Sequence, residues 1–107
     1  MAIETGSIRL EISGSLATLT LDRPGAANAV SPAMVADLES HVAALEGSRC
    51  AGLLVTGAAG RFCAGSDLAA VRQGLDQPAA ALALCERMTA LTHRLERLPM
   101  LRVAAVE

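Results

Sequence analysis

Two short stretches near the start of the chain alternate strictly between apolar and polar residues. Isoleucine and leucine occupy every second position over 8–12, and alanine and leucine do so over 17–21. A period of two predicts half-buried β-strands, which we place at 6–13 and 16–21. Ser13, Gly14 and Ser15 give the turn signal between them. We therefore expect these strands to form an antiparallel hairpin.

Two longer segments carry apolar residues at helical spacing. Ser31 and Pro32 open the first, since serine caps a helix and proline fits the first helical position, where an N–H would be unpaired anyway. Its apolar positions recur every three or four residues as far as 45, and Gly47 is a stop signal. The second segment carries leucine or methionine at 84, 88, 91, 95 and 98 and is ended by Pro99.

Two mainly apolar runs, at 51–56 and 101–106, predict further strands that are buried. A helix lies between the strands at 16–21 and 51–56, so a right-handed βαβ crossover should connect them. We also expect a short helix at 67–72 and a loop at 74–78. The order of elements predicts an α/β fold, with residues 1–107 forming part or all of one domain.

Composition adds a reason to expect a partner. Hydrophobic residues make up 52 % of the chain and charged residues only 19 %, although a small domain normally has a large charged surface. Either apolar faces are buried against another surface, or the many alanines alone produce this bias. The net charge is −2 and Phe62 is the only aromatic residue. Without a basic stripe or a stacking platform, nucleic acid is excluded as a partner.

The sequence also argues against membranes, metals and disulfides. No apolar run is long enough to cross a bilayer, and the first residues lack the basic and apolar regions of a signal peptide, so we expect a cytoplasmic protein. Cys50, Cys63 and Cys85 lie far apart in the sequence and are expected to be free thiols. The chain contains only two histidines, and no cluster with the spacing of a metal site is present.

The stretch from 55 to 68 (VTGAAGRFCAGSDL) carries the best candidate chemistry. A buried strand runs into a glycine-rich loop, and Gly65, Ser66 and Asp67 open a short helix. The first N–H groups of a helix have no internal partner, so the Ser66 N–H could donate to a developing oxyanion. The competing interpretation is an ordinary capping turn, with Asp67 as the anion at the helix start.

Three segments of the chain resemble the crotonase (enoyl-CoA hydratase/isomerase) superfamily. Residues 61–68 (RFCAGSDL) resemble the signature around its first oxyanion-hole residue. Residues 21–24 (LDRP), followed by Asn-Ala-Val at 28–30 and Ser-Pro at 31–32, resemble its strand, Arg-Pro turn and helix entry. Residues 98–106 resemble the next strand. The resemblance implies the N-terminal half of a crotonase-like (ClpP/crotonase) ββα spiral fold, completed by another chain.

The resemblance also implies roles for particular residues. The Ser66 backbone N–H would be one of two oxyanion donors to the thioester carbonyl. One wall of the coenzyme A groove would come from around Gly65 and the other from the loop after Arg23. The residues implied to line the groove are Ala26, Ala27, Ala29, Ala64, Gly65, Asp67 and Leu68. Arg23 either approaches the phosphates of coenzyme A or anchors its own turn. Coenzyme A would enter as part of the substrate, and no metal or other cofactor is implied.

The resemblance leaves part of the enzyme outside this chain. The second oxyanion donor, the acid/base carboxylates and the trimerisation helices of the family follow the last strand, and Glu107 stands where asparagine is usual. Losing one oxyanion donor typically costs about 100–1000-fold in rate. We therefore expect a subunit of a split enzyme, a lyase or isomerase acting on acyl-CoA or acyl-carrier thioesters, inactive alone and assembled with a second chain into a hetero-oligomer built on trimers.

Alternatives and weaker candidates remain open. The chain could be a non-catalytic acyl-CoA-binding or scaffold subunit, or a fragment of a full-length enoyl-CoA hydratase. His93 falls opposite the apolar stripe of its helix and is expected at the surface, while His41 lies near an apolar face and is expected to be structural. Cys63 lies in the signature, but its position favours a small buried side chain over a nucleophile.

Overall fold

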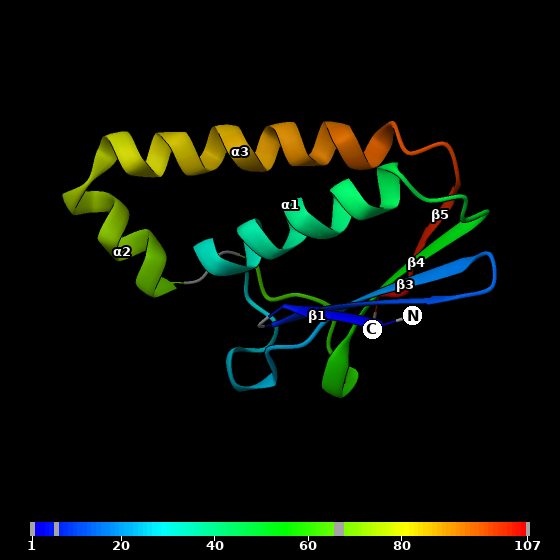
Figure 1. Cartoon of the computed structure of the whole chain (residues 1–107). Coiled ribbons are helices and arrows are strands. Elements are labelled where there is room, and N and C mark those ends of the chain that lie inside the picture. The colour runs from blue at the N-terminus through cyan, green and yellow to red at the C-terminus, as the bar shows by residue number, and fades with distance from the viewer. Residues whose placement is uncertain (1, 6, 66–67, 107) are drawn as a thin grey trace.

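The computed structural model describes residues 2–5, 7–65 and 68–106, which form a mixed sheet covered on one face by helices (Figure 1). Both α1 and α3 run above the sheet, while α2 and the start of α3 extend beyond its edge. The elements are β1 (Ala2–Thr5), β2 (Ile8–Ser13), β3 (Leu16–Leu21), the 3₁₀ turn η1 (Pro24–Ala26), α1 (Pro32–Glu46), β4 (Gly52–Gly57), the 3₁₀ turn η2 (Ala58–Gly60), α2 (Leu68–Asp76), α3 (Pro78–Glu96) and β5 (Leu101–Ala104).

The sheet follows the chain order β1-β2-β3-β4-β5. Strands β2 and β3 form the predicted antiparallel hairpin, turning at Gly14, whose φ of 61° suits glycine. Strand β4 pairs parallel to β3, and β5 pairs parallel to β4, so α1 lies on one crossover and α2 with α3 on the next. Strand β1, antiparallel to β2, was not predicted, because its four residues lack a clear alternation.

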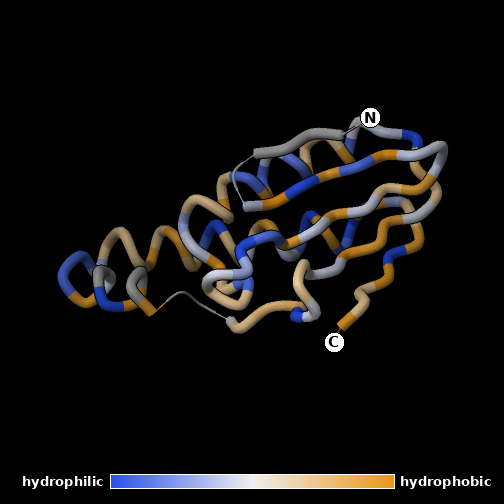
Figure 2. The backbone as a smooth tube through the Cα atoms, turned by 90° about the horizontal axis from the view of Figure 1, so that it is seen from below, coloured by the Kyte–Doolittle hydropathy of each residue, from blue (hydrophilic) through white to orange (hydrophobic). Residues whose placement is uncertain are grey.

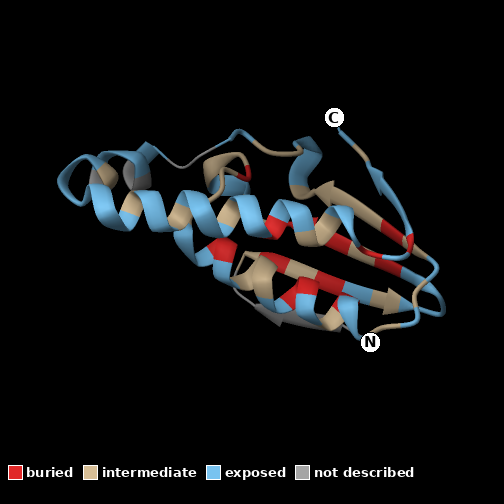
Figure 3. Cartoon of the chain, turned by 90° about the horizontal axis from the view of Figure 1, so that it is seen from above, coloured by how far each residue is buried: buried red, intermediate tan, exposed pale blue. Residues whose placement is uncertain are grey.

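The core lies between one face of the sheet and helices α1 and α3, as the burial colours of Figure 3 show. The predicted inward positions of β2, β3 and α1 are buried or, at Ile12 and Leu38, partly buried against the core, which confirms their periods. His41 on α1 is also buried, and its Nε2 lies 3.1 Å from the Ile8 carbonyl oxygen, so it belongs to the core as expected. The buried apolar residues are Ile8, Leu10, Ala17, Leu19, Leu21, Met34, Val35, Val42, Leu45, Leu53, Leu91, Leu98 and Met100.

Helix α1 begins and ends as its sequence predicts, and ion pairs fix α3 beside it. The Ser31 hydroxyl accepts a hydrogen bond from the Met34 N–H at 3.3 Å, and Gly47 follows the last turn. Two bidentate arginine–carboxylate pairs, seven residues apart on each helix, join the helices. The pairs are Arg87–Glu39, with Nε–Oε2 at 3.3 Å, and Arg94–Glu46, with Nη2–Oε1 at 2.7 Å. These hydrogen bonds lower the pKa of both carboxyl groups.

The region before α3 differs from the prediction. Helix α2 continues through Gly74 to Asp76, and Gln77 alone separates it from α3. The expected loop at 74–78 is therefore wrong except at Gln77, because 74–76 belong to α2 and Pro78 begins α3. A Cβ at Gly74 would lie 3.0 Å from Ala81 Cβ, so glycine permits close packing of the two helices instead of breaking the first.

The face of the sheet turned away from the helices is viewed in Figure 2, where hydrophilic and hydrophobic residues alternate along β2. On β2 it carries Arg9, whose Nε lies 3.1 Å from the Asp22 carboxylate. Strand β5 was predicted to be buried, but its side chains are exposed, with Leu101 at 74 % and Val103 at 52 %. The pairing of Leu54 with Val103 and the burial of Leu53 place both β5 residues on this open face. An apolar strip is left uncovered there.

Candidate functional site

Two loops leave the sheet at the same edge. Strand β3 ends at Leu21 and β4 at Gly57, and these residues are partners in the parallel pairing. The loops that follow, 22–31 and 58–65, therefore start side by side at the carboxyl ends of their strands. Ligands of open α/β sheets bind at this kind of edge.

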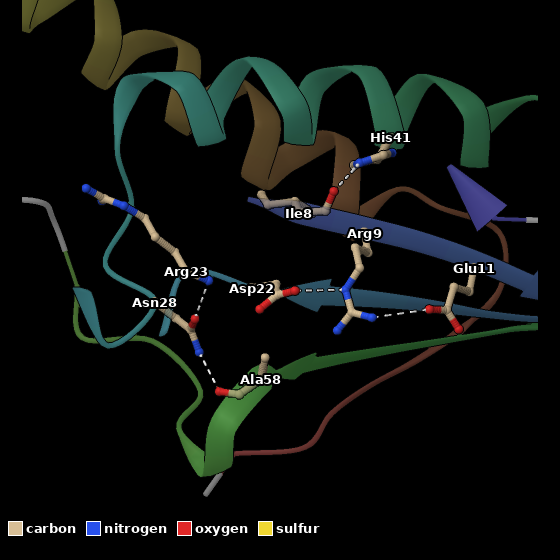
Figure 4. A network of polar contacts seen from close by, with 8 residues as sticks. All are labelled: Ile8, Arg9, Glu11, Asp22, Arg23, Asn28, His41 and Ala58. Carbon is tan, nitrogen blue, oxygen red and sulfur yellow. Dashed lines mark hydrogen bonds and ion pairs between the residues drawn. The ribbon is translucent and has the colours of Figure 1, made fainter. Parts of the chain in front are cut away.

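A single buried side chain ties the loops together (Figure 4). Asn28, with none of its surface exposed, donates from Nδ2 to the Arg61 carbonyl at 2.7 Å and to the Ala58 carbonyl at 3.1 Å. Its Oδ1 accepts from the Arg23 N–H at 2.7 Å. The backbone of Asn28 is left-handed, with φ of 59°, a conformation that asparagine tolerates better than most residues. Asn28 lies in the motif at 28–30 that resembles the family, but no function was predicted for it from the sequence.

A second contact joins the loops nearer α1. The Val30 N–H donates to the Gly65 carbonyl at 2.7 Å, and the Arg23 guanidinium donates to the Ala29 carbonyl at 3.0 Å. Of the two roles considered for Arg23, the structure thus shows the anchoring of its own turn. Gly65 has φ of 98°, which favours glycine.

Gly57 allows the second loop to fold back on itself. A Cβ at this position would lie only 1.8 Å from the Arg61 carbonyl oxygen and 2.6 Å from that of Phe62. Only hydrogen fits between these backbone segments. The loop therefore closes tightly at Gly57, with the Asn28 amide bonded to carbonyls of Ala58 and Arg61 inside it.

An open cavity of about 310 Å³ lies between the loops. Ala27 lines it from the first loop and Ala64 from the second, so two predicted groove residues meet there. The described residues that line it are Ala27, Arg61, Phe62, Cys63, Ala64 and Val106. Apart from the Arg61 guanidinium and the Cys63 thiol, these side chains are apolar, and none is a carboxylate or a histidine. Arg61 and Phe62 were not predicted as site residues, although both lie in the quoted signature.

The remaining predicted residues divide into three groups. Ala26 and Ala29 lie on the first loop beside Ala27, and Gly65 lies beside Ala64 on the second. Leu68 begins α2 with its side chain 74 % exposed and does not line this cavity. Ser66 and Asp67 lie outside the described residues, so the oxyanion donor and the helix-start anion remain predictions.

Of the other candidates, Cys63 lines the cavity, whereas His93 does not. His93 is exposed on α3, 3.8 Å from Glu96, as expected. Cys63 has its sulfur 3.4 Å from the Gly65 nitrogen and is partly buried. Among the described residues, no three metal-binding side chains gather in one place. None of the helices in those same ranges combines the length and apolar character of a membrane span.

The fold and site thus define an α/β protein with an open cavity beside the carboxyl ends of its parallel strands β3 and β4. The chain belongs to the enoyl-CoA hydratase/isomerase family, because the model of that family matches residues 11–107. The predicted crotonase fold is therefore confirmed, as the N-terminal part of that fold.

Relatives and solved structures agree with this assignment. The chain is 40 % identical to an ethylmalonyl-CoA decarboxylase of Danio rerio, over all of its own length and 36 % of that protein. It is 38 % identical to the human ethylmalonyl-CoA decarboxylase, over 95 % of this chain and 34 % of the other. The chain thus spans about a third of the length of the curated relatives it matches.

Two crystal structures illustrate the shared fold. Pseudomonas aeruginosa AtuE superposes with a TM-score of 0.88 at 33 % identity, over 94 % of this chain and 40 % of that one. An enoyl-CoA hydratase from Polaromonas sp. superposes with a TM-score of 0.86 at 26 % identity, over 95 % and 40 %. In each case most of the neighbour's chain has no counterpart in the 107 residues.

Proposed function

We propose that this chain supplies the N-terminal, coenzyme A-binding part of a crotonase-family enzyme acting on acyl-CoA thioesters. The observation that carries the proposal is the pair of joined loops with a cavity between them, in a chain of this family. An apolar cavity suits the pantetheine arm, and the Arg61 guanidinium beside it suits a phosphate or a carboxylate.

The Ser66 N–H is the proposed oxyanion donor within this chain. Gly65 supports the assignment, since its positive φ turns the backbone sharply just before that N–H. A preorganised backbone donor stabilises developing charge more strongly in a completed site that excludes water than it would in water. The donor belongs to the main chain, so the serine hydroxyl has no part in the step.

Decarboxylation of a 2-carboxyacyl-CoA, such as ethylmalonyl-CoA, is the reaction we favour. It is supported by the relatives, which at 34–40 % identity are ethylmalonyl-CoA decarboxylases. In this reaction the bond to the carboxylate breaks, CO₂ leaves, and the electron pair moves onto the thioester oxygen as an enolate that is then protonated. No base has to remove a proton first, which is consistent with a cavity lacking carboxylate and histidine among its described lining residues. Hydration or isomerisation of an enoyl-CoA is the second candidate, supported by the family assignment.

A further part of the domain should cover the apolar strip on β5. The matched structures are much longer than this chain, which accounts for only about 40 % of their length. We propose that the remaining part of a crotonase domain packs on the open face at Leu101 and Val103 and supplies the second oxyanion donor. It is carried either by a separate chain, as in a split enzyme, or by the same polypeptide. The native mass of the assembly distinguishes the two.

Turnover by the purified assembly tests this function. With ethylmalonyl-CoA as substrate, the assembly should release CO₂ and form butyryl-CoA, which chromatography detects. An enoyl-CoA substrate tests the second candidate reaction. Ser66→Pro, which lacks the N–H, should react about 100–1000-fold more slowly than Ser66→Ala, which keeps it. Binding of coenzyme A thioesters without turnover of either substrate would instead support a non-catalytic scaffold subunit. Equal rates for the two variants would contradict the role of the N–H.

A further inference from the structure

Asn28 is the side chain that connects the two walls of the cavity. It follows Ala27, which lines the first wall, and it donates to the carbonyl of Arg61, which lines the second. Its other donor bond reaches Ala58, thirty residues away in the sequence. The Val30–Gly65 hydrogen bond closes the same pair of loops at the other end. Two sets of hydrogen bonds therefore join the walls of the cavity, one made by the Asn28 side chain and one by the backbone of Val30 and Gly65. We call the hydrogen bonds of the Asn28 side chain the brace.

The chemistry of this brace fits asparagine closely. A carboxamide offers two N–H donors and an acceptor oxygen, and here both donors and the oxygen are used. Aspartate has the same shape but cannot donate when ionised, so the oxygen in place of Nδ2 would face two carbonyl oxygens. Glycine accepts the left-handed backbone at this position but provides no brace.

The brace joins the loops around the cavity, and its residues lie outside the hydrophobic core cluster. The core cluster lies between the sheet and the helices and does not include Asn28, Ala58 or Arg61. The partners of the Asn28 side chain are loop backbone groups, all within the two loops that enclose the cavity. Loss of the brace should therefore change the separation of the walls first.

We propose that Asn28 is a positioning residue, whose amide sets the distance between the two walls of the coenzyme A groove. The proposal rests on the proposed function, because it takes coenzyme A as the ligand of that groove. Asn28 itself need not touch the ligand. It acts through the backbone of Ala58 and Arg61 on one side and of Ala27 on the other.

Binding of free coenzyme A to the purified assembly, measured by isothermal titration calorimetry, tests this role. Asn28→Gly removes the side chain and keeps the backbone conformation accessible. Asn28→Asp keeps the shape and the acceptor for the Arg23 N–H but removes both donors. Ala59→Gly is the matched control, because Ala59 also has a positive φ of 60° and does not line the cavity. Circular dichroism and the melting temperature select a temperature at which every variant is folded.

Both Asn28 variants should bind coenzyme A at least about tenfold more weakly than the unmodified assembly, and Ala59→Gly within about twofold of it. Equal weakening by the two shows that the donor bonds matter, whereas tight binding by Asn28→Asp would overturn the proposal. A purely structural role would lower the melting temperature but leave the affinity of the folded variants unchanged, which also overturns it. If the unmodified assembly does not bind coenzyme A, the proposed function itself fails and this inference fails with it.

Should both variants fail to fold, the unmodified assembly provides the test through hydrogen exchange. Coenzyme A should slow amide exchange in Ala58–Gly60, which does not line the cavity but is held by the brace. Slowed exchange in that segment supports the inference. Exchange that slows at the cavity-lining residues but not at Ala58–Gly60 would overturn it.

Discussion

Replacing Gly57 with alanine tests the tight closure of the second loop. The new Cβ would lie 1.8 Å from the Arg61 carbonyl oxygen, whereas real Cβ contacts stay beyond 3.0 Å. The backbone must therefore move by about 1.2 Å, the difference between these two distances. The clashing atoms of Arg61 and Phe62 are all main chain, so no side chain can rotate away to relieve the contact.

The cost has two parts. Overpacking of this kind costs about 1–3 kcal/mol. The Arg61 carbonyl also accepts the 2.7 Å bond from Asn28, and a shift of that size directly away from the amide would lengthen the bond beyond hydrogen-bonding range. A buried amide left without its partner costs about 1–3 kcal/mol more. We expect Gly57→Ala to lower the free energy of unfolding by about 2–6 kcal/mol.

Urea denaturation followed by circular dichroism at a fixed protein concentration measures this cost. With a slope of about 2 kcal/mol per molar urea, the midpoint should fall by about 1–3 M. Gly25→Ala is the control, because a Cβ there meets nothing within 4 Å, and it should be neutral or stabilising by up to about 1 kcal/mol. A midpoint for Gly57→Ala within about 0.3 M of the control would refute the close approach at this loop.

Two further predictions concern the helix pairs and the open face of the sheet. The Glu39 and Glu46 pKa values are lowered from 4.5 by hydrogen bonds from arginine, so the stability they contribute is present above that pH and is lost as the pH falls through the lowered values. Urea midpoints measured down to about pH 3 should therefore fall less steeply for the double variant Glu39→Gln/Glu46→Gln, and an unchanged slope would contradict this. Leu101→Ser with Val103→Ser should weaken association with the remaining crotonase part at least about tenfold, measured by native mass spectrometry, whereas Ser13→Ala on the same sheet should not. If the Leu101→Ser/Val103→Ser variant and the Ser13→Ala variant associate equally well, β5 is not the covered surface.

Local periodicity was sufficient to predict most of the fold. The hairpin, the crossover from β3 to β4 and both main helices follow from the spacing of apolar residues and from the signals at Ser31, Gly47 and Pro99. The extent of α2 was not predictable in this way. Gly74 carries no side chain to mark a helical face, and its close packing against Ala81 depends on a neighbouring helix.

The two segments that form the site could be predicted from the sequence, but the contacts that join them could not. The resemblance named residues in both loops, including Ala27 and Ala64, which meet at the cavity. The bridging role of Asn28 could not be found in the sequence, because its partners are backbone carbonyls thirty or more residues away. Such contacts do not depend on the identity of the partner side chain, so they leave no pattern to detect. The only signal was an asparagine between alanines in a loop, where a left-handed backbone is common.

The native mass of the purified assembly, recorded with and without coenzyme A, tests the central claim most directly. The account predicts that the 107 residues occur together with the remaining part of a crotonase domain, on one polypeptide or two, and that each copy binds one coenzyme A. A stable monomer of 10.9 kDa that binds no coenzyme A would contradict both the uncovered face on β5 as an interface and the groove between the loops.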